Sequence, residues 1–190
     1  MMTIHDAKKD EKKENKKEGT LRLLTPGEIK LAKSVFMSTI PYNKVWIHCD
    51  SYLPFGLQDN HTAMSPNGEI YFRLPLYHKD FSQSVDDFQH LFIHEMSHVW
   101  QRGHGMNVIA RGLGSWLVSY RYTLDGRLLS EYPMEQQAQI IADHFVLDNC
   151  GYYLWNRLRQ GKEPVITCDD NIPEVIIREK YKHCLRGFPW

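Results

Sequence analysis

The sequence has no long apolar stretch, since no run of about 18 apolar residues, the length that crosses a bilayer, occurs in the chain. It also has no surplus of charge, because 23 lysines and arginines balance 23 aspartates and glutamates. Nothing global therefore attracts nucleic acid or an anionic membrane, and we expect neither as a partner. The first residues lack the apolar centre of a signal peptide, so we expect synthesis in the cytoplasm without classical export.

Cysteine is scarce as well, and no two cysteines have C-x-x-C spacing. The four residues of this type are Cys49, Cys150, Cys168 and Cys184. They form neither a recognisable zinc knuckle nor a disulfide framework. We expect reduced thiols, and the alternative is one disulfide among the three C-terminal cysteines.

Large apolar side chains are almost absent from residues 6–19, where lysines and acids alternate. Such a segment cannot bury enough surface to offset its ordering entropy. A basic targeting arm is the less favoured alternative, because acids interrupt the lysines. We therefore predict a disordered charged tail over residues 1–19. The rest of the 190 residues is long enough for one core, so residues 20–190 are predicted to form a single domain.

The informative feature that is present is the motif H-E-x-x-H, formed by His94, Glu95 and His98. On a helix, residues four positions apart lie on one face, so the two imidazoles can share one metal ion. Glu95 can then reach a water on that metal without being a ligand itself. The alternative is a core helix with two hydrogen-bonded histidines.

The residues around the motif predict a helix over residues 85–101. Ser84 is the expected N-cap, with Asp87 completing a variant of the capping box. Apolar side chains surround the polar triplet, namely Phe88, Leu91, Phe92, Met96 and Val99. A charged glutamate in such a run is costly to bury without a partner, and a metal site provides one.

Other patterns predict an α+β fold in which a small antiparallel or mixed sheet packs on the H-E-x-x-H helix and on a second, ligand-bearing helix. A first helix begins with the Thr25–Glu28 capping box and ends at Pro41. Strands are expected over residues 44–49 and 68–74, and the turn at residues 65–68 predicts a hairpin. The remaining expected elements are two short strands around Asp125-Gly126, a helix over residues 133–149, and a last helix capped by Asn171 and Glu174 with Ile172, Ile176 and Leu185 facing inward.

A catalytic zinc site needs a third protein ligand, and two residues compete for this place. His104 has the spacing of H-E-x-x-H-x-x-G-x-x-H, but Gln101 stands where that pattern needs a glycine for a sharp turn. Glu135 lies in the first turn of the second helix, on the face of Ala138 and Ala142, whose small side chains permit close packing. Glu135 is favoured over His104, and Asp143 and Glu131 are the remaining alternatives.

The run FIHEMSHVWQ, followed by YRYTLDG and EYPMEQQAQIIADHF, resembles the zincin metallopeptidases of the gluzincin type. In these enzymes H-E-x-x-H precedes a helix that begins E-x-x-A. Over roughly residues 50–148 the chain also resembles bacterial zincin-like domains associated with type VI secretion spike proteins and polymorphic toxins. It departs from thermolysin-like enzymes at Gln139, where those have an aspartate. Asp143, one turn later, is the candidate to orient a ligand histidine instead.

The resemblance implies a zinc-dependent metallopeptidase whose Zn²⁺ is bound by His94, His98 and Glu135, with Glu95 as general base. Donors to the developing oxyanion are sought among aromatic and histidine side chains near the motif. The candidates are His104 and Tyr122, which rank first, and Tyr120 and His144. Residues 69–74 are the candidate strand edge for an extended substrate.

The implied partners are a peptide or protein substrate, a secretion spike protein and an immunity protein. The implied role is that of an antibacterial effector or toxin that leaves the cell through a specialised secretion system. One alternative is a catalytically silent effector cargo or adaptor with a structural metal site, which binds its partner through the aromatic C-terminal third of the chain. Another is a hydrolase of peptidoglycan peptides, which differs only in its substrate.

Overall fold

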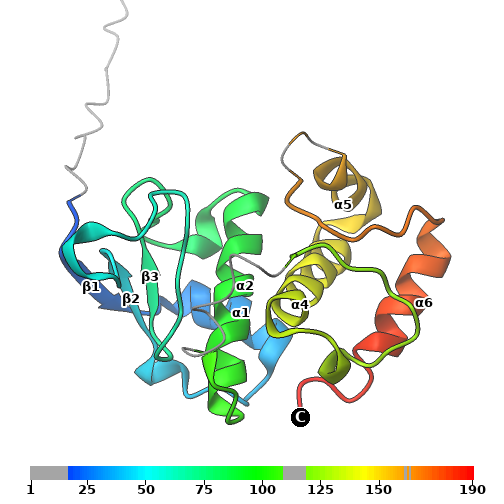
Figure 1. The fold of residues 1–190 in the computed structure, drawn as a ribbon, viewed down its shortest axis with the longest axis horizontal. Helices are drawn as coiled ribbons and strands as arrows, with labels where there is room; N and C mark the ends of the chain where they lie inside the picture. The colour runs from blue at the N-terminus through cyan, green and yellow to red at the C-terminus, as the bar shows by residue number, and fades with distance from the viewer. Residues whose placement is uncertain (1–16, 109–118, 161, 163) are drawn as a thin grey trace, which may run out of the picture.

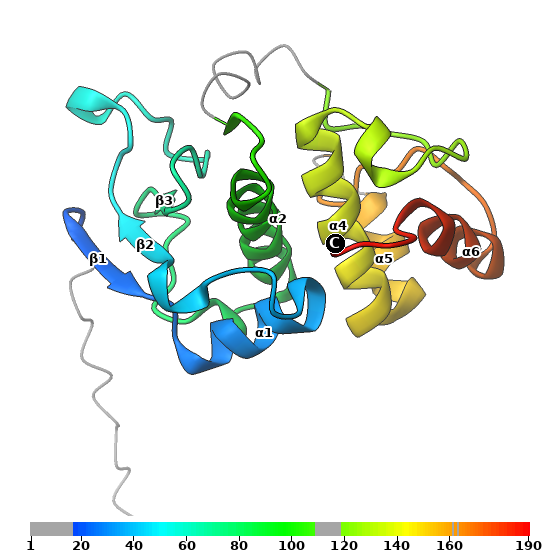
Figure 2. The same cartoon turned by 90° about the horizontal axis from the view of Figure 1, so that it is seen from below.

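The computed structural model describes residues 17–108, 119–160, 162 and 164–190. Its strands are β1 (Thr20–Leu23), β2 (Trp46–Cys49) and β3 (Ile70–Phe72). Its α-helices are α1 (Pro26–Phe36), α2 (Asp86–Gly103), α4 (Met134–Asn149), α5 (Gly151–Arg159) and α6 (Glu174–Cys184). Figures 1 and 2 show α2 in the middle of the molecule, with the sheet on one side and α4, α5 and α6 on the other. The α+β class predicted from the sequence is confirmed.

The sheet has the order β1-β2-β3 and is mixed, because β1 pairs antiparallel with β2 and β2 pairs parallel with β3. The predicted hairpin around residues 65–68 is reduced to a single antiparallel bridge between Met64 and Tyr71. Since β3 has β2 on one edge and Met64 on the other, the prediction that residues 69–74 form an open substrate edge is wrong. Parallel strands need a long crossover, and residues 50–69 supply it.

The N-terminus of α1 has the predicted capping box. The Thr25 hydroxyl accepts from the Glu28 main-chain N–H at 3.1 Å, and the Glu28 carboxylate accepts from the Thr25 N–H at 2.8 Å. The buried Glu28 carboxylate also pairs with Arg22 at 2.7 Å, which joins α1 to the end of β1. The helix ends at Phe36 rather than at Pro41, because Met37 has a φ of 51° and so leaves the helical conformation.

α2 carries the H-E-x-x-H motif and packs along α4 (Figure 2). Its N-cap is Val85 without a side-chain hydrogen bond, so the prediction of a Ser84 cap is wrong. The Ser84 hydroxyl instead donates to the Phe81 carbonyl at 2.6 Å. On α4, Ala138 and Ala142 are fully buried, as the close approach of the two helices requires.

The C-terminal third differs from the sequence prediction in three places. The segment after Gly151 forms α5, which the sequence did not predict. The last helix begins after Pro173 without the predicted capping box, and Asn171 instead accepts a hydrogen bond from Arg159. Its buried face contains Ile177 and not Ile176, which is 49% exposed.

Two further segments bear on the predictions. In place of the two strands around Asp125-Gly126, the structure has an isolated parallel bridge between Tyr122 and Cys168. None of the four cysteines is in a disulfide bond. Glu18, at the end of the predicted tail, pairs with Arg73 at 2.7 Å, whereas residues 1–16 lie outside the described residues. Residues 109–118 also lie outside them.

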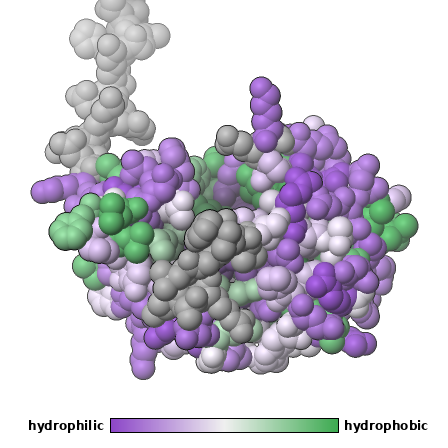
Figure 3. Space-filling model, viewed as in Figure 1, coloured by the Kyte–Doolittle hydropathy of each residue, from purple (hydrophilic) through white to green (hydrophobic). Residues whose placement is uncertain are grey.

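The face of the molecule in Figure 3 is mostly polar, with some apolar side chains at the surface on the side of the sheet. Exposed apolar residues in and next to β1 and β2 are Leu21, Leu23, Phe55 and Leu57. Within the described residues, no helix is both long enough and apolar enough to cross a membrane.

Candidate metal centre

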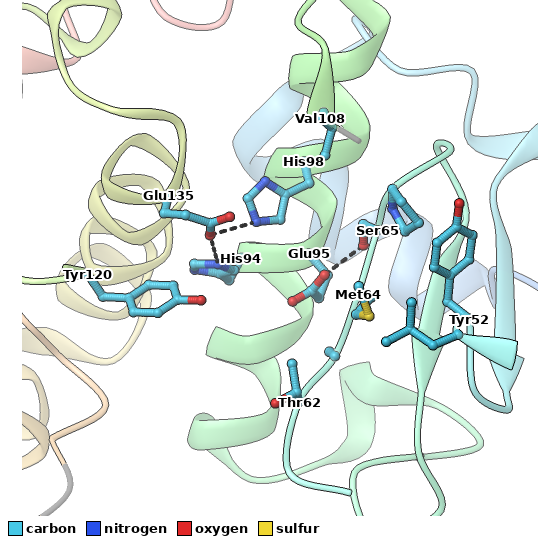
Figure 4. Close-up of a pocket in the computed structure, with 13 residues that line it drawn as sticks. Tyr52, Thr62, Met64, Ser65, His94, Glu95, His98, Val108, Tyr120 and Glu135 are labelled. Carbon is cyan, nitrogen blue, oxygen red and sulfur yellow. Dashed lines mark hydrogen bonds and ion pairs between the residues drawn. The ribbon is translucent and has the colours of Figure 1, made fainter. Parts of the chain in front are cut away.

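Three metal-binding side chains meet where α2 packs against the start of α4. His94 and His98 come from one face of α2, and Glu135 comes from the first turn of α4. Their ligand atoms all lie within 4.8 Å of one another. Glu135 Oε2 is 3.5 Å from His94 Nε2 and 3.2 Å from His98 Nε2 (Figure 4). All three side chains are buried, so the structure brings together the three residues that the sequence favoured as ligands.

The charges of this cluster depend on one another. Burial alone would raise the pKa of the Glu135 carboxyl, but the two histidines hold that pKa well below its usual range. Burial likewise lowers the pKa of His98, but its hydrogen bond to Glu135 and the negative charge of Glu135 outweigh this and raise the pKa to about 9. Without a metal ion, a proton on His98 therefore balances the buried carboxylate.

Gln101 fixes the orientation of His98. The Gln101 amide nitrogen donates to the Met134 carbonyl at 2.9 Å, so its oxygen must be the atom that faces His98 Nδ1 at 2.8 Å. An oxygen acceptor there keeps a proton on Nδ1, so Nε2 is the nitrogen that would bind a metal ion. In the metal-free protein Nε2 carries the second proton and donates to Glu135. The same amide connects the end of α2 to the start of α4. The sequence indicated only that Gln101 is not the glycine that a metzincin turn needs.

Glu95 lies beside the cluster without belonging to it. Its side chain is buried, and Oε2 accepts a hydrogen bond of 2.7 Å from the Ser65 hydroxyl. Ser65 is also buried and directly follows Met64 in the crossover between β2 and β3. Figure 4 shows the other carboxylate oxygen of Glu95 turned toward the side on which His94 and Tyr120 lie. No sequence pattern points to Ser65, because the contact joins residues 30 positions apart.

Two residues that the sequence ranked first as oxyanion donors lie elsewhere. His104 is the C-cap of α2, and its two ring nitrogens contact the carbonyl oxygens of Trp100 at 2.8 Å and Trp190 at 2.6 Å. Tyr122 is buried and its hydroxyl donates to Asp143 Oδ2 at 2.8 Å. Neither residue lines the cavity beside the cluster. The structure therefore gives no support to the predicted roles of His104 and Tyr122 at the reacting atoms.

Asp143 is also placed differently from the prediction, because it does not orient a ligand histidine. Its Oδ1 accepts from His90 Nε2 at 2.8 Å, one turn before His94, and also from Gln139 at 2.8 Å. Its Oδ2 accepts from Tyr122 and, at 3.1 Å, from the Thr167 main-chain N–H. Asp143 thus joins α2, α4 and the segment before α6 through a buried polar network.

A cavity opens beside the cluster and includes all three candidate ligands in its wall; its empty space of about 680 Å³ includes the part open to solvent. Most of the remaining lining residues are apolar or aromatic, namely Tyr52, Leu53, Ala63, Met64, Pro66, Val108 and Tyr120. The polar ones are Thr62, Ser65 and Glu95. The ring of Tyr120 is 5.9 Å from that of His94 (Figure 4). Burial, together with the charges of Glu135 and Glu95, raises the pKa of Tyr120 to about 12, so its hydroxyl keeps its proton at neutral pH. A concave apolar space with a few polar groups at one end is typical of a binding site.

The fold and the cluster together define a class: an α+β protein with a buried candidate site for a single metal ion, set between two packed helices. No model of a known protein family matches the sequence. The type VI secretion system spike protein VgrG2b of Pseudomonas aeruginosa is 41% identical over 139 residues, which are 67% of this chain and 13% of that protein. The chain thus spans only a small part of that relative.

The solved structure of the effector domain of Pseudomonas aeruginosa VgrG2b matches this fold with a TM-score of 0.63 and 36% sequence identity. The match covers 78% of this chain and 84% of that domain. The chain therefore belongs to the family of the VgrG2b effector domain, and this membership supports a role as a type VI secretion effector.

Proposed function

We propose that the protein is a zinc-dependent peptidase of the zincin type. The observation that carries the proposal is the buried set of His94, His98 and Glu135 at the end of a cavity. Two imidazole nitrogens and one carboxylate oxygen are a common donor set of catalytic zinc sites, which keep a fourth position open. The cavity supplies space for that position. A structural zinc site instead closes with four protein ligands, so the cavity favours catalysis over the catalytically silent alternative.

His94, His98 and Glu135 would hold the zinc ion, which would supply a Lewis acid for the scissile carbonyl and lower the pKa of a bound water toward neutrality. Glu95 is the general base of the proposed reaction. Its Oε1 accepts the proton of the attacking water and later delivers that proton to the nitrogen of the leaving amine. Glu95 suits this role because its carboxylate lines the cavity and it is not one of the three residues whose ligand atoms form the cluster.

Tyr120 replaces His104 and Tyr122 as the proposed donor to the developing oxyanion. It lines the cavity close to His94, and it retains its proton over the whole physiological pH range. Tyr120 is 42% exposed, but a hydrogen-bond donor at the wall of a mainly apolar cavity stabilises negative charge more than the same donor does in bulk water.

The main chain around Met64 replaces residues 69–74 as the proposed substrate edge. Met64 uses both its N–H and its carbonyl to pair with Tyr71, at 3.1 Å and 2.8 Å. In an antiparallel pair the neighbouring residues direct their main-chain groups to the opposite edge. Ala63 and Ser65 both line the cavity, so this edge faces the candidate metal centre. An extended peptide can add to it as a strand.

Delivery is proposed from the family relationship. The relative is named as a type VI secretion spike protein, which suggests a spike protein as the delivery partner of this chain. A protein or peptide in a competing cell is then the proposed substrate, and an immunity protein in the producing cell the proposed inhibitor.

The test is zinc content measured together with hydrolysis of a mixed peptide library. Purified protein should carry about one zinc ion per chain, as one three-ligand site requires, and should cleave peptides in the library. Glu95→Gln should keep the zinc and the melting temperature but lose roughly 10²–10⁴-fold in turnover, because only the proton transfer is removed. Stoichiometric zinc that survives replacement of both histidines would refute the proposed ligand set.

A further inference from the structure

A hydrogen bond connects Ser65, in the crossover between β2 and β3, to Glu95, the proposed catalytic base. The Ser65 hydroxyl donates to Glu95 Oε2 at 2.7 Å, and both residues are almost inaccessible, with 4% of the surface of each exposed. Both also line the cavity beside the metal cluster. A buried contact of this length to a charged acceptor is a strong hydrogen bond.

We propose that Ser65 is a positioning residue for Glu95. Its hydroxyl holds Oε2, so that the carboxylate cannot rotate freely and Oε1 is the oxygen presented to the cavity. This inference rests on the proposed function, because it assigns a task to Glu95 that only a hydrolytic site requires.

The physical reason lies in the number of rotatable bonds of a glutamate. A Glu side chain anchored on a helix has three torsions, of which the last is broad and roughly twofold. Without a partner, the two oxygens of Glu95 would exchange places, and the oxygen nearest to the reacting water would vary in position. One fixed hydrogen bond from outside the helix removes this freedom, and errors of about 1 Å in such placements lower rates by about 100-fold.

The position of Ser65 in the chain adds a second argument. Ser65 follows Met64, which pairs with Tyr71, and Ala63 and Ser65 on either side of Met64 line the cavity. The segment proposed to hold the substrate therefore also holds the base (Figure 4). A substrate that pairs with this edge is placed in register with the oxygen that Ser65 presents.

The experiment compares Ser65→Thr with Ser65→Val. The two replacement side chains fill nearly the same volume and differ in the hydroxyl group, so a difference between them reports the hydrogen bond and not the packing. Ser97→Ala is the matched control, because Ser97 is a buried serine of α2 whose hydroxyl donates to the Ile93 carbonyl at 2.8 Å and not to Glu95.

Two readouts are taken from each protein. The first is the visible absorption spectrum of the cobalt-loaded protein, which responds to charge and hydrogen bonding around the ion and needs no substrate. The second is the separate measurement of kcat and KM on a library peptide that the parent protein cleaves.

We expect Ser65→Val to shift the cobalt spectrum in the direction of Glu95→Gln and to lower kcat by about 10-fold or more, a part of the general-base contribution, with KM unchanged. Ser65→Thr and Ser97→Ala should resemble the parent in both readouts. Equal spectra for Ser65→Val, Ser65→Thr and the parent would overturn the inference. A parent that binds cobalt and shows the expected spectral differences but cleaves no peptide would refute the peptidase proposal, while the placement of Glu95 by Ser65 would stand without a task in hydrolysis.

Discussion

At the scale of single residues, Glu135 has two possible explanations: it stabilises the start of α4, or it binds a metal ion. An acidic side chain in the first turn of a helix is favoured by the helix dipole whether or not a metal is bound. Its carboxylate nevertheless lies within 3.5 Å of both motif histidines, and although burial raises its pKa, the hydrogen bonds to these histidines hold that pKa well below its usual range. This geometry, and not the dipole, makes Glu135 a candidate ligand.

Glu135→Ala should therefore weaken zinc binding by more than the roughly 10- to 100-fold that loss of an outer partner costs, because it removes one of three direct ligands. His104→Ala should leave zinc affinity unchanged, since both ring nitrogens of His104 face carbonyl oxygens away from the cavity. Titration of both variants against a competing chelator at neutral pH measures this. Retention of zinc by the Glu135 variant and its loss by the His104 variant would reverse the assignment.

Tyr120 and Tyr122 offer a second comparison between neighbours. Tyr120→Phe should lower kcat by about 10²–10³-fold if its hydroxyl stabilises the oxyanion, with little change in stability. Tyr122→Phe should leave kcat near that of the parent but lower the free energy of unfolding by roughly 1–3 kcal/mol, because the buried Asp143 loses a hydrogen-bond donor. Steady-state kinetics and urea denaturation of the same two proteins separate the effects. Equal losses of kcat in both would contradict the division of roles.

Sequence reasoning found the residues whose role follows from local spacing and missed those whose role depends on distant contacts. His94, Glu95 and His98 are set by helical geometry alone. Gln101 and Ser65 act through partners on other segments, and no pattern near them in the sequence signals this. The sequence ranks Tyr122 above Tyr120, but it does not show that the Tyr122 hydroxyl donates its hydrogen bond to Asp143.

At the scale of elements, the packing of α2 on α4 decides whether the ligands meet. Ala138 lies three residues after Glu135, hence on the same face of α4, and is fully buried. A larger side chain at position 138 would push α4 away from α2 close to the point where the three candidate ligands meet.

Ala138→Leu is therefore expected to destabilise the protein by about 1–3 kcal/mol through overpacking and also to weaken zinc binding. Ala32→Leu is the matched control, because Ala32 is equally buried but belongs to α1. It should cost a similar free energy of unfolding without a change in zinc affinity. Chemical denaturation and chelator competition give the two quantities. Equal zinc affinity in both variants would show that α2 and α4 tolerate a change in their separation.

Element boundaries were predictable where a capping pattern was satisfied locally and were not where tertiary contacts replaced it. Thr25 and Glu28 form their capping box as expected. Ser84 and Asn171 do not cap, because their side chains bond to Phe81 and Arg159 instead. The sequence predicts a small antiparallel or mixed sheet but not its strand order. The pairing between β1, β2 and β3 depends on a crossover that has no periodic pattern in the sequence.

At the scale of the whole molecule, stability should depend on pH and on metal together. The pKa of His98 in the folded, metal-free protein is raised to about 9 from an ordinary value of 6.5. A raised pKa stabilises the fold fully below the ordinary value, and the stabilisation is lost as the pH rises through the folded value. The metal-free protein should therefore lose thermal stability between about pH 6.5 and pH 9.

Zinc should remove this dependence, because His98 then binds the ion through Nε2 and carries no proton there. Melting temperatures measured across this range with chelator and with saturating zinc test the prediction. A metal-free protein whose melting temperature is as flat with pH as that of the zinc-loaded form would contradict the assigned charge state of the cluster.

The placement of the ligands on two helices that are distant in sequence has a further consequence. In the proposed zinc site, a bound ion would cross-link α2 and α4, and it would bind only to the folded chain because the unfolded chain has no assembled site. Zinc binding would therefore stabilise the folded state, and this stabilisation would rise with the concentration of free zinc. In a compartment poor in zinc, the same domain would both work more slowly and be degraded sooner. One ion concentration would thus set the activity of the protein and its lifetime.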